Sequence, residues 1–384
     1  MCFIIPLSTR CGLPKTTSKY QLRLLPRKKE SVASKIFRSL SGLISADKMS
    51  SGKGHLGPFL SPNTQGGRTE IRPGKVKRLL LGSSLDLIDA FAKEARLLYD
   101  LKHDNIVGFK AVCHDPVALM LEYVYFDLSV FGGEGQVSSL NDFMACLDTH
   151  NCEGIEGSFM TKIASDIAAG LLYLHERGIA HRDLKPANVL VSNHHYREEE
   201  DRDKLAYAWS HQPVVCKLTD FGESKSLFLQ TRSVCQSRTL DIDRGTVPFM
   251  APEILIGGDI SRGGATVEDL LRVDMWAYGM LLFNLLNPCL HHPFQEVLKK
   301  EDNGDTKEKI IRFHRKGERL KQTQKYAKRC QLEWRNVWNV YEACTVVQPC
   351  GRPDATNALR LPHQSTRVGC LQGSILQERY EFLI

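Results

Sequence analysis

The chain has 384 residues, enough for one large domain or two ordinary ones, and 42% of them are hydrophobic, which excludes a disordered polymer. Its formal net charge of +7 is a modest excess that favours acidic partners and gives no reason to expect nucleic acid. The 12 cysteines form no CxxC pair, which excludes a common type of zinc module and favours a reducing, cytoplasmic or nuclear location. The longest strongly apolar stretch, residues 275–286, is too short to cross a bilayer, so no membrane span is expected.

The N-terminal region is basic. No acidic residue precedes Glu30, a composition shared by flexible basic arms and by organellar transit peptides. Ser, Gly, Lys and Pro dominate from residue 31 to residue 67. We therefore predict a flexible arm over 1–48, and organellar targeting stays open.

Regular secondary structure is predicted from about residue 85. Residues 84–103 carry apolar side chains at helical spacing, which predicts an amphipathic helix. Residues 105–113 and 117–124 are apolar and β-branched and are separated by HDP, which predicts two adjacent strands joined by a turn. This part of the chain therefore predicts a small sheet with one helix.

A second helix is predicted over residues 159–178, where an apolar stripe ends at Gly178. Further on, two strand-like segments, 187–192 and 213–222, flank a polar stretch. That stretch, 193–212, contains adjacent histidines and an acidic run, and we interpret it as a solvated hairpin insertion rather than a metal site.

Five short motifs follow one another in a characteristic order. They are HRDLKPANVL at 181–190, DFG at 220–222, APE at 251–253, DMWAYGM at 274–280 and GRP at 351–353. Together they resemble the signature of the eukaryotic protein kinase family, serine/threonine type. The resemblance is strong over 90–357 and weak over 50–90. Residues 101–113 are also similar to the lymphokine-activated killer T-cell-originated kinase group, but so short a segment leaves the subfamily open.

The resemblance implies an α+β protein kinase fold with two lobes and a nucleotide bound between them. One lobe is a small antiparallel β-sheet with one helix, and the other is larger and mainly helical. The expected boundaries are 49–124 for the small lobe, poorly defined before residue 70, 125–362 for the large lobe, and 363–384 for a C-terminal tail.

The family's chemistry explains the polar loop at 181–190. Phosphoryl transfer requires the triphosphate to be held, its charge neutralised and the acceptor hydroxyl oriented. By resemblance, Asp183 orients the substrate hydroxyl and Lys185 lies near the transferring phosphate. Asn188 and Asp220 would hold Mg²⁺, whose preference for oxygen ligands suits an amide, a carboxylate and ATP phosphates. Lys185 and Thr246 resemble the serine/threonine pattern, so protein Ser/Thr hydroxyls are the expected acceptors.

Other motif residues resemble regulatory or structural parts of the family. Arg182 resembles the arginine that pairs with a phosphate in the activation segment, although a segment that needs no phosphorylation stays open. Glu253 and Arg352 resemble a structural ion pair, and Asp274 resembles the carboxylate that holds the backbone of the 181–185 loop. The possible phosphate acceptors are Thr231, Ser233, Ser237 and Thr239.

In the small lobe, Glu94 matches the family's helix glutamate. A lysine about 17 residues upstream should pair with it and reach the ATP phosphates. Lys77 fits that separation, while Lys75, which is 19 residues upstream, is the competing assignment. We favour Lys77 because VKRLLL leads into apolar residues, as that strand should.

The remaining nucleotide contacts are expected in two segments. A G-x-G-x-x-G pattern, whose glycines let the backbone approach phosphate, consists of Gly52, Gly54 and Gly57. Pro58 is awkward in a following strand, so a chance match stays open. The family's hinge, which binds adenine, would comprise Leu121, Glu122 and Val124.

Two hypotheses on function therefore stand. The first is an active Ser/Thr kinase that uses ATP and Mg²⁺ on protein substrates. The second is a pseudokinase scaffold with weak or no turnover, favoured by the irregular glycine pattern and by Lys75. A basic stretch between residues 291 and 330 is either a solvated face or a docking site for an acidic partner.

Overall fold

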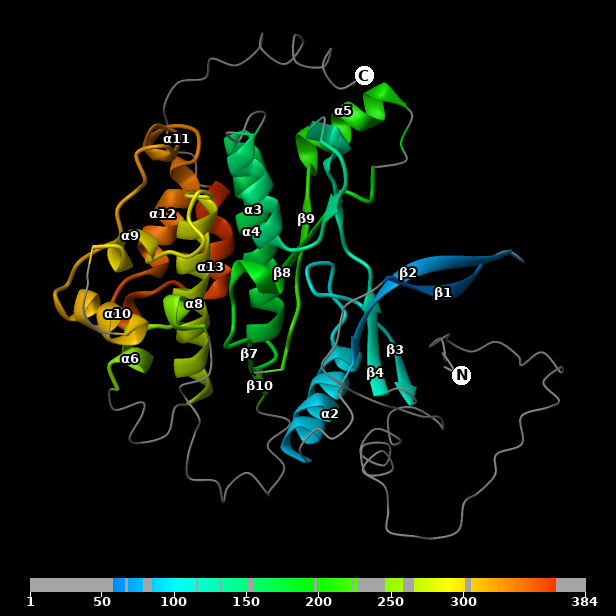
Figure 1. Ribbon diagram of the computed structural model, residues 1–384, viewed down its shortest axis with the longest axis horizontal. Coiled ribbons are helices and arrows are strands. Elements are labelled where there is room, and N and C mark those ends of the chain that lie inside the picture. Colours follow the sequence, from blue (N-terminus) through cyan, green and yellow to red (C-terminus); the bar gives the residue numbers. More distant parts are fainter. Residues whose placement is uncertain are drawn as a thin grey trace. The chain divides into compact units, whose positions relative to one another are not determined.

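The computed structural model of the chain is shown in Figure 1. It describes residues 58–65, 68–78, 85–114, 117–131, 133–150, 155–196, 199, 201–222, 224–226, 246–257, 266–300 and 305–363. The described chain separates into two compact units. The smaller unit has the described residues up to Lys102 together with Val107–Tyr123, and the larger has His103–Ile106 and the described residues from Val124 onward.

The smaller unit contains an antiparallel sheet with strand order β1-β2-β4-β3. Its strands are β1 Pro58–Gln65, β2 Arg68–Arg78, β3 Phe109–His114 and β4 Val117–Glu122. β1 lies at an edge and pairs only with β2 among the described strands. Pro58, which is awkward in a central strand, is the first residue of this edge strand, where its missing N–H does not break the sheet.

One helix, α2 (Leu85–Asp100), belongs to the smaller unit. Phe91, Ala95 and Leu98 are buried, whereas Lys93 is exposed, so the helix is amphipathic as the sequence predicts. Glu94 departs from this pattern because it is a charged residue with only 4% of its surface exposed. A buried carboxylate needs a partner, and this one has it in β2.

The larger unit is mainly helical. Its helices are α3 Leu140–Thr149, α4 Gly157–His175, α5 Arg202–His211, α6 Pro252–Leu255, α8 Val267–Leu285, α9 Gln295–Leu298, α10 Thr306–Arg315, α11 Ala327–Gln331, α12 Arg335–Cys344 and α13 Ala355–Arg360. Short strands pair as β5 (Phe126–Asp127) with β6 (Gln136–Val137), β7 (Ile179–Ala180) with β10 (Lys225–Ser226), and β8 (Val189–Ser192) with β9 (Val215–Leu218).

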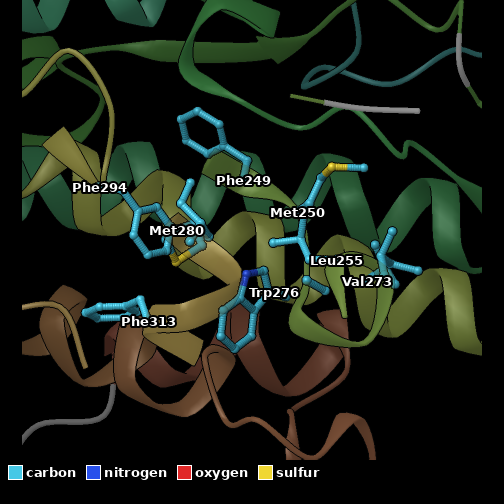
Figure 2. Packing of buried hydrophobic residues seen from close by; sticks show 11 residues of the cluster. Phe249, Met250, Leu255, Val273, Trp276, Met280, Phe294 and Phe313 are labelled. Atoms are coloured by element: carbon cyan, nitrogen blue, oxygen red, sulfur yellow. The ribbon is translucent and has the colours of Figure 1, made fainter. Parts of the chain in front are cut away.

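Helix α8 lies at the centre of this unit. Its N-terminus is fixed by a capping box between Thr266 and Asp269, and all of its residues from Val273 onward are buried. Trp276 and Met280 on α8 pack with Phe294 and Phe313 in one apolar cluster (Figure 2). No helix in the described ranges is both long and apolar enough to cross a membrane.

The polar stretch predicted as a simple hairpin insertion contains a helix. β8 and β9 pair in antiparallel register, as predicted, but α5 lies between them, and Asp201 caps it by accepting from the amides of Asp203 and Lys204. Trp209 on α5 lies against Phe131 and Phe159, with ring centroids 5.8 and 5.9 Å away. The insertion is therefore anchored by aromatic packing as well as by the hairpin.

Candidate active site

The loop that follows β7 is held by a carboxylate from α8. Asp274 is fully buried, and its two oxygens accept hydrogen bonds from the backbone amides of His181 and Arg182, both at 2.8 Å. His175 Nε2 lies 3.0 Å from the same carboxylate. Arg182 has a φ of 70°, a conformation that costs energy for a residue with a side chain. The Asp274 hydrogen bonds stabilise the loop in that strained conformation.

Asp183 is the centre of a hydrogen-bond network. Its Oδ1 accepts from the backbone N and from Oγ1 of Thr246, both at 3.1 Å. Its Oδ2 accepts from Lys185 Nζ at 2.7 Å and from Asn188 Nδ2 at 3.0 Å. Lys185 Nζ also donates to Thr246 Oγ1 at 2.7 Å. The Asp183 carboxylate is thereby fixed in orientation, with one cation beside it.

Asn188 lies in the short 3-10 turn Pro186–Asn188, where the chain enters β8. Its Nδ2 donates to the carbonyl and to Oδ2 of Asp183, so Oδ1 is the atom oriented to accept a ligand. The amide of Thr219, just after β9, donates to the Asn188 carbonyl at 3.0 Å. Pairing of β8 with β9 therefore places the backbone of Thr219, and with it the next residue Asp220, near Asn188 in space.

Asp220 has a φ of 63°. Among the described non-glycine residues, Asp220 and Arg182 are the two with a positive φ, which is a strained conformation. Asn188 and Asp220 supply one amide and one carboxylate oxygen, which are ligands that suit Mg²⁺. The described chain has no cluster of three or more His, Cys, Asp and Glu residues able to bind a metal. This small donor set fits Mg²⁺ because that ion completes its shell with waters and substrate phosphates.

In the smaller unit, Lys77 Nζ lies 2.8 Å from both carboxylate oxygens of Glu94. Lys77 is on β2, where it pairs with Leu119 of β4, and its side chain is 36% exposed. Lys75 lies two residues earlier on the same face of the strand, and its side chain is outside the described part of the chain. Of the two competing lysines, the structure thus shows the Glu94 contact for Lys77.

The other expected nucleotide contacts are only partly described. Leu121 is buried in β4, and Glu122, the last residue of this strand, donates its amide to the Gly108 carbonyl at 2.8 Å. Val124 is buried in the larger unit. The expected glycine pattern, Gly52, Gly54 and Gly57, and the expected phosphate acceptors, Thr231, Ser233, Ser237 and Thr239, lie outside the described residues.

The segment after Thr246 is anchored by a buried ion pair. Arg352 is 2% exposed and contacts Glu253 with both terminal nitrogens, at 2.6 and 2.8 Å. Its guanidinium also donates to the carbonyl of Arg272 and lies 5.0 Å from the ring centre of Trp276. The bidentate geometry explains why arginine is required here.

Sequence reasoning missed a polar clamp on β9. Asp166, buried on α4, accepts from the Cys216 amide at 2.9 Å, and Lys162 Nζ lies 2.5 Å from its other oxygen. Asn105 Nδ2 donates to the Cys216 carbonyl at 2.9 Å. Burial raises the pKa of Asp166, and the Lys162 charge opposes that shift. One sequence signal pointed to this clamp: Asp166 is an acidic residue next to Ile167, within the apolar stripe of the predicted helix over 159–178.

Comparison with known proteins identifies the family of the chain. The protein kinase domain model matches residues 75–363. Similar proteins include the serine/threonine-protein kinase RAD53 of Saccharomyces cerevisiae, 30% identical over 57% of this chain and 22% of that protein. The inhibitor of nuclear factor kappa-B kinase subunit alpha of Danio rerio is 28% identical over 56% of this chain and 24% of its own length.

A third relative is the dual specificity protein kinase splA of Dictyostelium discoideum, 31% identical over 51% of this chain and 7% of that protein. The chain thus spans less than a quarter of each of these three relatives. The family match covers most of the chain, including the Asp183 network and the Lys77–Glu94 pair. The chain therefore belongs to the protein kinase domain family and has its two-lobed α+β fold.

Proposed function

We propose that this protein is a serine/threonine kinase that transfers the γ-phosphate of ATP, bound with Mg²⁺, to Ser and Thr hydroxyls of protein substrates. The observation that carries the proposal is the network around Asp183. Thr246 and Lys185 bind both each other and the Asp183 carboxylate, so three side chains from two distant segments form one unit. Such preorganisation is what phosphoryl transfer requires of the protein.

Each member of the network has a separate part in the proposed reaction. Asp183 accepts a hydrogen bond from the substrate hydroxyl and orients its oxygen toward the phosphate. The charge of Lys185 offsets negative charge that develops on the transferring group. Thr246 fixes both side chains through its hydroxyl.

Metal and phosphate binding fall to the other residues of the site. Asn188 and Asp220 would hold Mg²⁺, which supplies positive charge to neutralise the phosphates. Lys77 would bind ATP phosphates while Glu94 keeps its ammonium in place. The strained backbone of Asp220 is consistent with a residue selected for ligand binding rather than for stability.

The test is transfer of radiolabelled phosphate from ATP to peptides that differ only in the acceptor, Ser, Thr or Tyr. We expect labelling of the Ser and Thr peptides, lost in the Asp183→Asn variant and in EDTA. Because one relative is named a dual specificity kinase, the Tyr peptide is an essential arm. Labelling of the Tyr peptide alone would contradict the proposal.

The alternative is a pseudokinase that acts as a scaffold. Two sequence features favour it: the irregular glycine pattern at residues 52–57, and Lys75 at a position where the family has a small residue. A thermal shift with ATP and Mg²⁺ separates the two hypotheses. We expect ATP to raise the unfolding temperature of the parent chain but not of Asp220→Ala, whereas a scaffold that does not bind ATP would show no shift in either.

Regulation by phosphorylation is a further part of the proposal. Arg182 directly precedes Asp183, and its backbone amide is fixed by Asp274. A phosphate on the segment between Asp220 and Thr246 would pair with the Arg182 guanidinium and order that segment. Phosphatase treatment should then lower activity in the parent, and an unchanged activity would favour a segment that needs no phosphate.

A further inference from the structure

Helix α10 presents two chemically different faces. Ile310 and Phe313 are buried, whereas Arg312 and Arg315 are exposed. Lys316, the C-cap residue, is exposed as well. The helix therefore uses one side for packing, and the solvent side of its last turn is basic, whereas Glu308 is an exposed acid in its first turn.

The basic side continues past the end of the helix. Between residues 309 and 321 the one acidic side chain is Glu318, which lies 3.8 Å from Lys316. Arg315, Arg319 and Lys321 are exposed and take part in no ion pair with any described residue. We define the basic face as Arg312, Arg315, Lys316, Arg319 and Lys321.

Stabilisation of the helix dipole explains only part of this face. Arg312 and Arg315 lie in the last turn of α10, where positive charge is favourable. Gly317, with a φ of 67°, ends the helix. Arg319 and Lys321 come after this turn, and the dipole effect does not extend to them.

The opposite face of α10 connects to the candidate active site. Ile310 and Phe313 belong to the apolar cluster of Figure 2, which includes Phe249 and Met250. Those two residues follow Thr246, whose hydroxyl bonds Asp183. The basic face is thus carried by a helix that packs directly on the segment beside the proposed acceptor site.

We propose that the basic face binds an acidic segment of the protein substrate, at some distance from the phosphorylated residue. This inference rests on the proposed function, which requires a protein substrate. Nucleic acid fits less well because the aromatic residue of this stretch, Phe313, is buried and offers no stacking surface. A membrane fits less well because Leu320, its one apolar residue past the helix, packs against the cluster.

Direct binding provides the first test, since it does not depend on catalysis. We would measure how tightly the full chain binds a fluorescent peptide rich in Glu and Asp. The control is the same peptide with Gln and Asn in place of Glu and Asp. We expect binding of the acidic peptide alone, weakened by salt. The triple variant Arg315→Gln, Arg319→Gln, Lys321→Gln should bind it about tenfold more weakly, because each exposed ion pair contributes little.

A matched variant controls for net charge. Lys328→Gln, Arg335→Gln, Arg360→Gln also removes three exposed cations, and these lie on α11, α12 and α13. Figure 1 shows α11 well away from α10. Binding by this control within twofold of the parent is expected, whereas an equal loss in both variants would overturn the proposal.

Kinetics separate this inference from the proposed function. Two Ser peptides are compared as substrates, one with an acidic extension and one with a neutral extension. The parent chain should phosphorylate the acidic peptide with a KM several-fold lower than that of the neutral peptide, whereas the triple variant should show no such difference. Phosphorylation of both with equal KM would overturn the inference and leave the kinase proposal standing. If neither is phosphorylated, the binding assay still decides the inference. The inference would also be overturned if single-stranded RNA or phosphatidylserine vesicles bound the parent chain as tightly as the acidic peptide does, and if the triple variant weakened that binding equally.

Discussion

Two regions of the molecule hold a functional carboxylate in different ways. In the larger unit, Asp183 accepts four hydrogen bonds, and its loop is fixed in turn by the buried Asp274. In the smaller unit, Glu94 is buried and its described partner is Lys77, which is 36% exposed. The described contacts of Asp183 come from three residues of the larger unit, whereas the described ion pair of Glu94 joins a buried carboxylate to a partly exposed lysine. Substitutions in the two regions should therefore differ in how much they lower activity and how much they lower the free energy of unfolding.

The largest effect is expected at Asp183. Asp183→Asn keeps the size of the side chain but removes the charge and the ability to accept a proton, so kcat should fall about 1,000-fold. Unfolding by urea should change little by comparison, because Thr246 can still bond to the remaining carbonyl oxygen. Asp203→Asn, an exposed carboxylate on α5, is the control. A kcat within tenfold of the parent would remove Asp183 from its proposed role.

The next prediction concerns Asp274, whose carboxylate holds the backbone of the loop that carries Asp183. Asp274→Ala leaves the amides of His181 and Arg182 without their acceptor in a buried site, which should lower the free energy of unfolding by about 3 kcal/mol. Asp269→Ala on the same helix removes the N3 carboxylate of the capping box, with an expected cost of about 1 kcal/mol. Equal urea midpoints for the two variants would show that Asp274 does not stabilise the loop.

At the second region, Lys77→Met should lower kcat/KM for ATP about 100-fold, because a charge aimed at the phosphates is lost. It should also destabilise the chain, since Glu94 loses its described partner in a buried position. The double variant Lys77→Met, Glu94→Leu should recover stability without recovering activity. If the double variant regains activity, the ion pair has only a structural role.

The contrast between the regions also shows what could be predicted from the sequence. The family and the two-lobed fold follow from ordered motifs, and the comparison with the kinase domain confirms both. The strands beside Asn188 and Asp220 were predictable because each is a local apolar run. The sequence favoured Lys77 over Lys75 through the apolar residues that follow it, but it left Lys75 open because residues two apart share one face of a strand. The contact of Lys77 with Glu94 agrees with the favoured assignment.

The helix in the insertion was missed for a related reason. α5 has ten residues and is mostly polar, so its apolar stripe is reduced to Leu205 and Trp209, four residues apart. The cap at Asp201 was a usable signal. What fixes the helix is the contact of Trp209 with Phe131 and Phe159, and such long-range packing cannot be read from a local pattern.

The smallest effect concerns a buried group that lacks the kind of partner Glu94 has. His314 lies against Trp276 and Phe294, its Nε2 is buried without a hydrogen-bond partner in the described chain, and burial lowers its pKa to about 4. In the unfolded chain the pKa is near 6.5, so the unfolded state binds the proton first as the pH falls. Stability should be unaffected by this group above pH 6.5 and should decrease from there down to pH 4.

Between pH 7 and pH 5 this decrease should amount to about 2 kcal/mol from His314. His314→Phe keeps an aromatic ring in the cluster and removes the titration, so its urea midpoint should fall less over that range than the midpoint of the parent. His150→Gln, an exposed histidine, should follow the parent. Parallel pH profiles for the parent and His314→Phe would mean that the folded chain protonates His314 as readily as the unfolded one. The lack of a partner would then carry no cost, and the contrast with the paired Glu94 would fail.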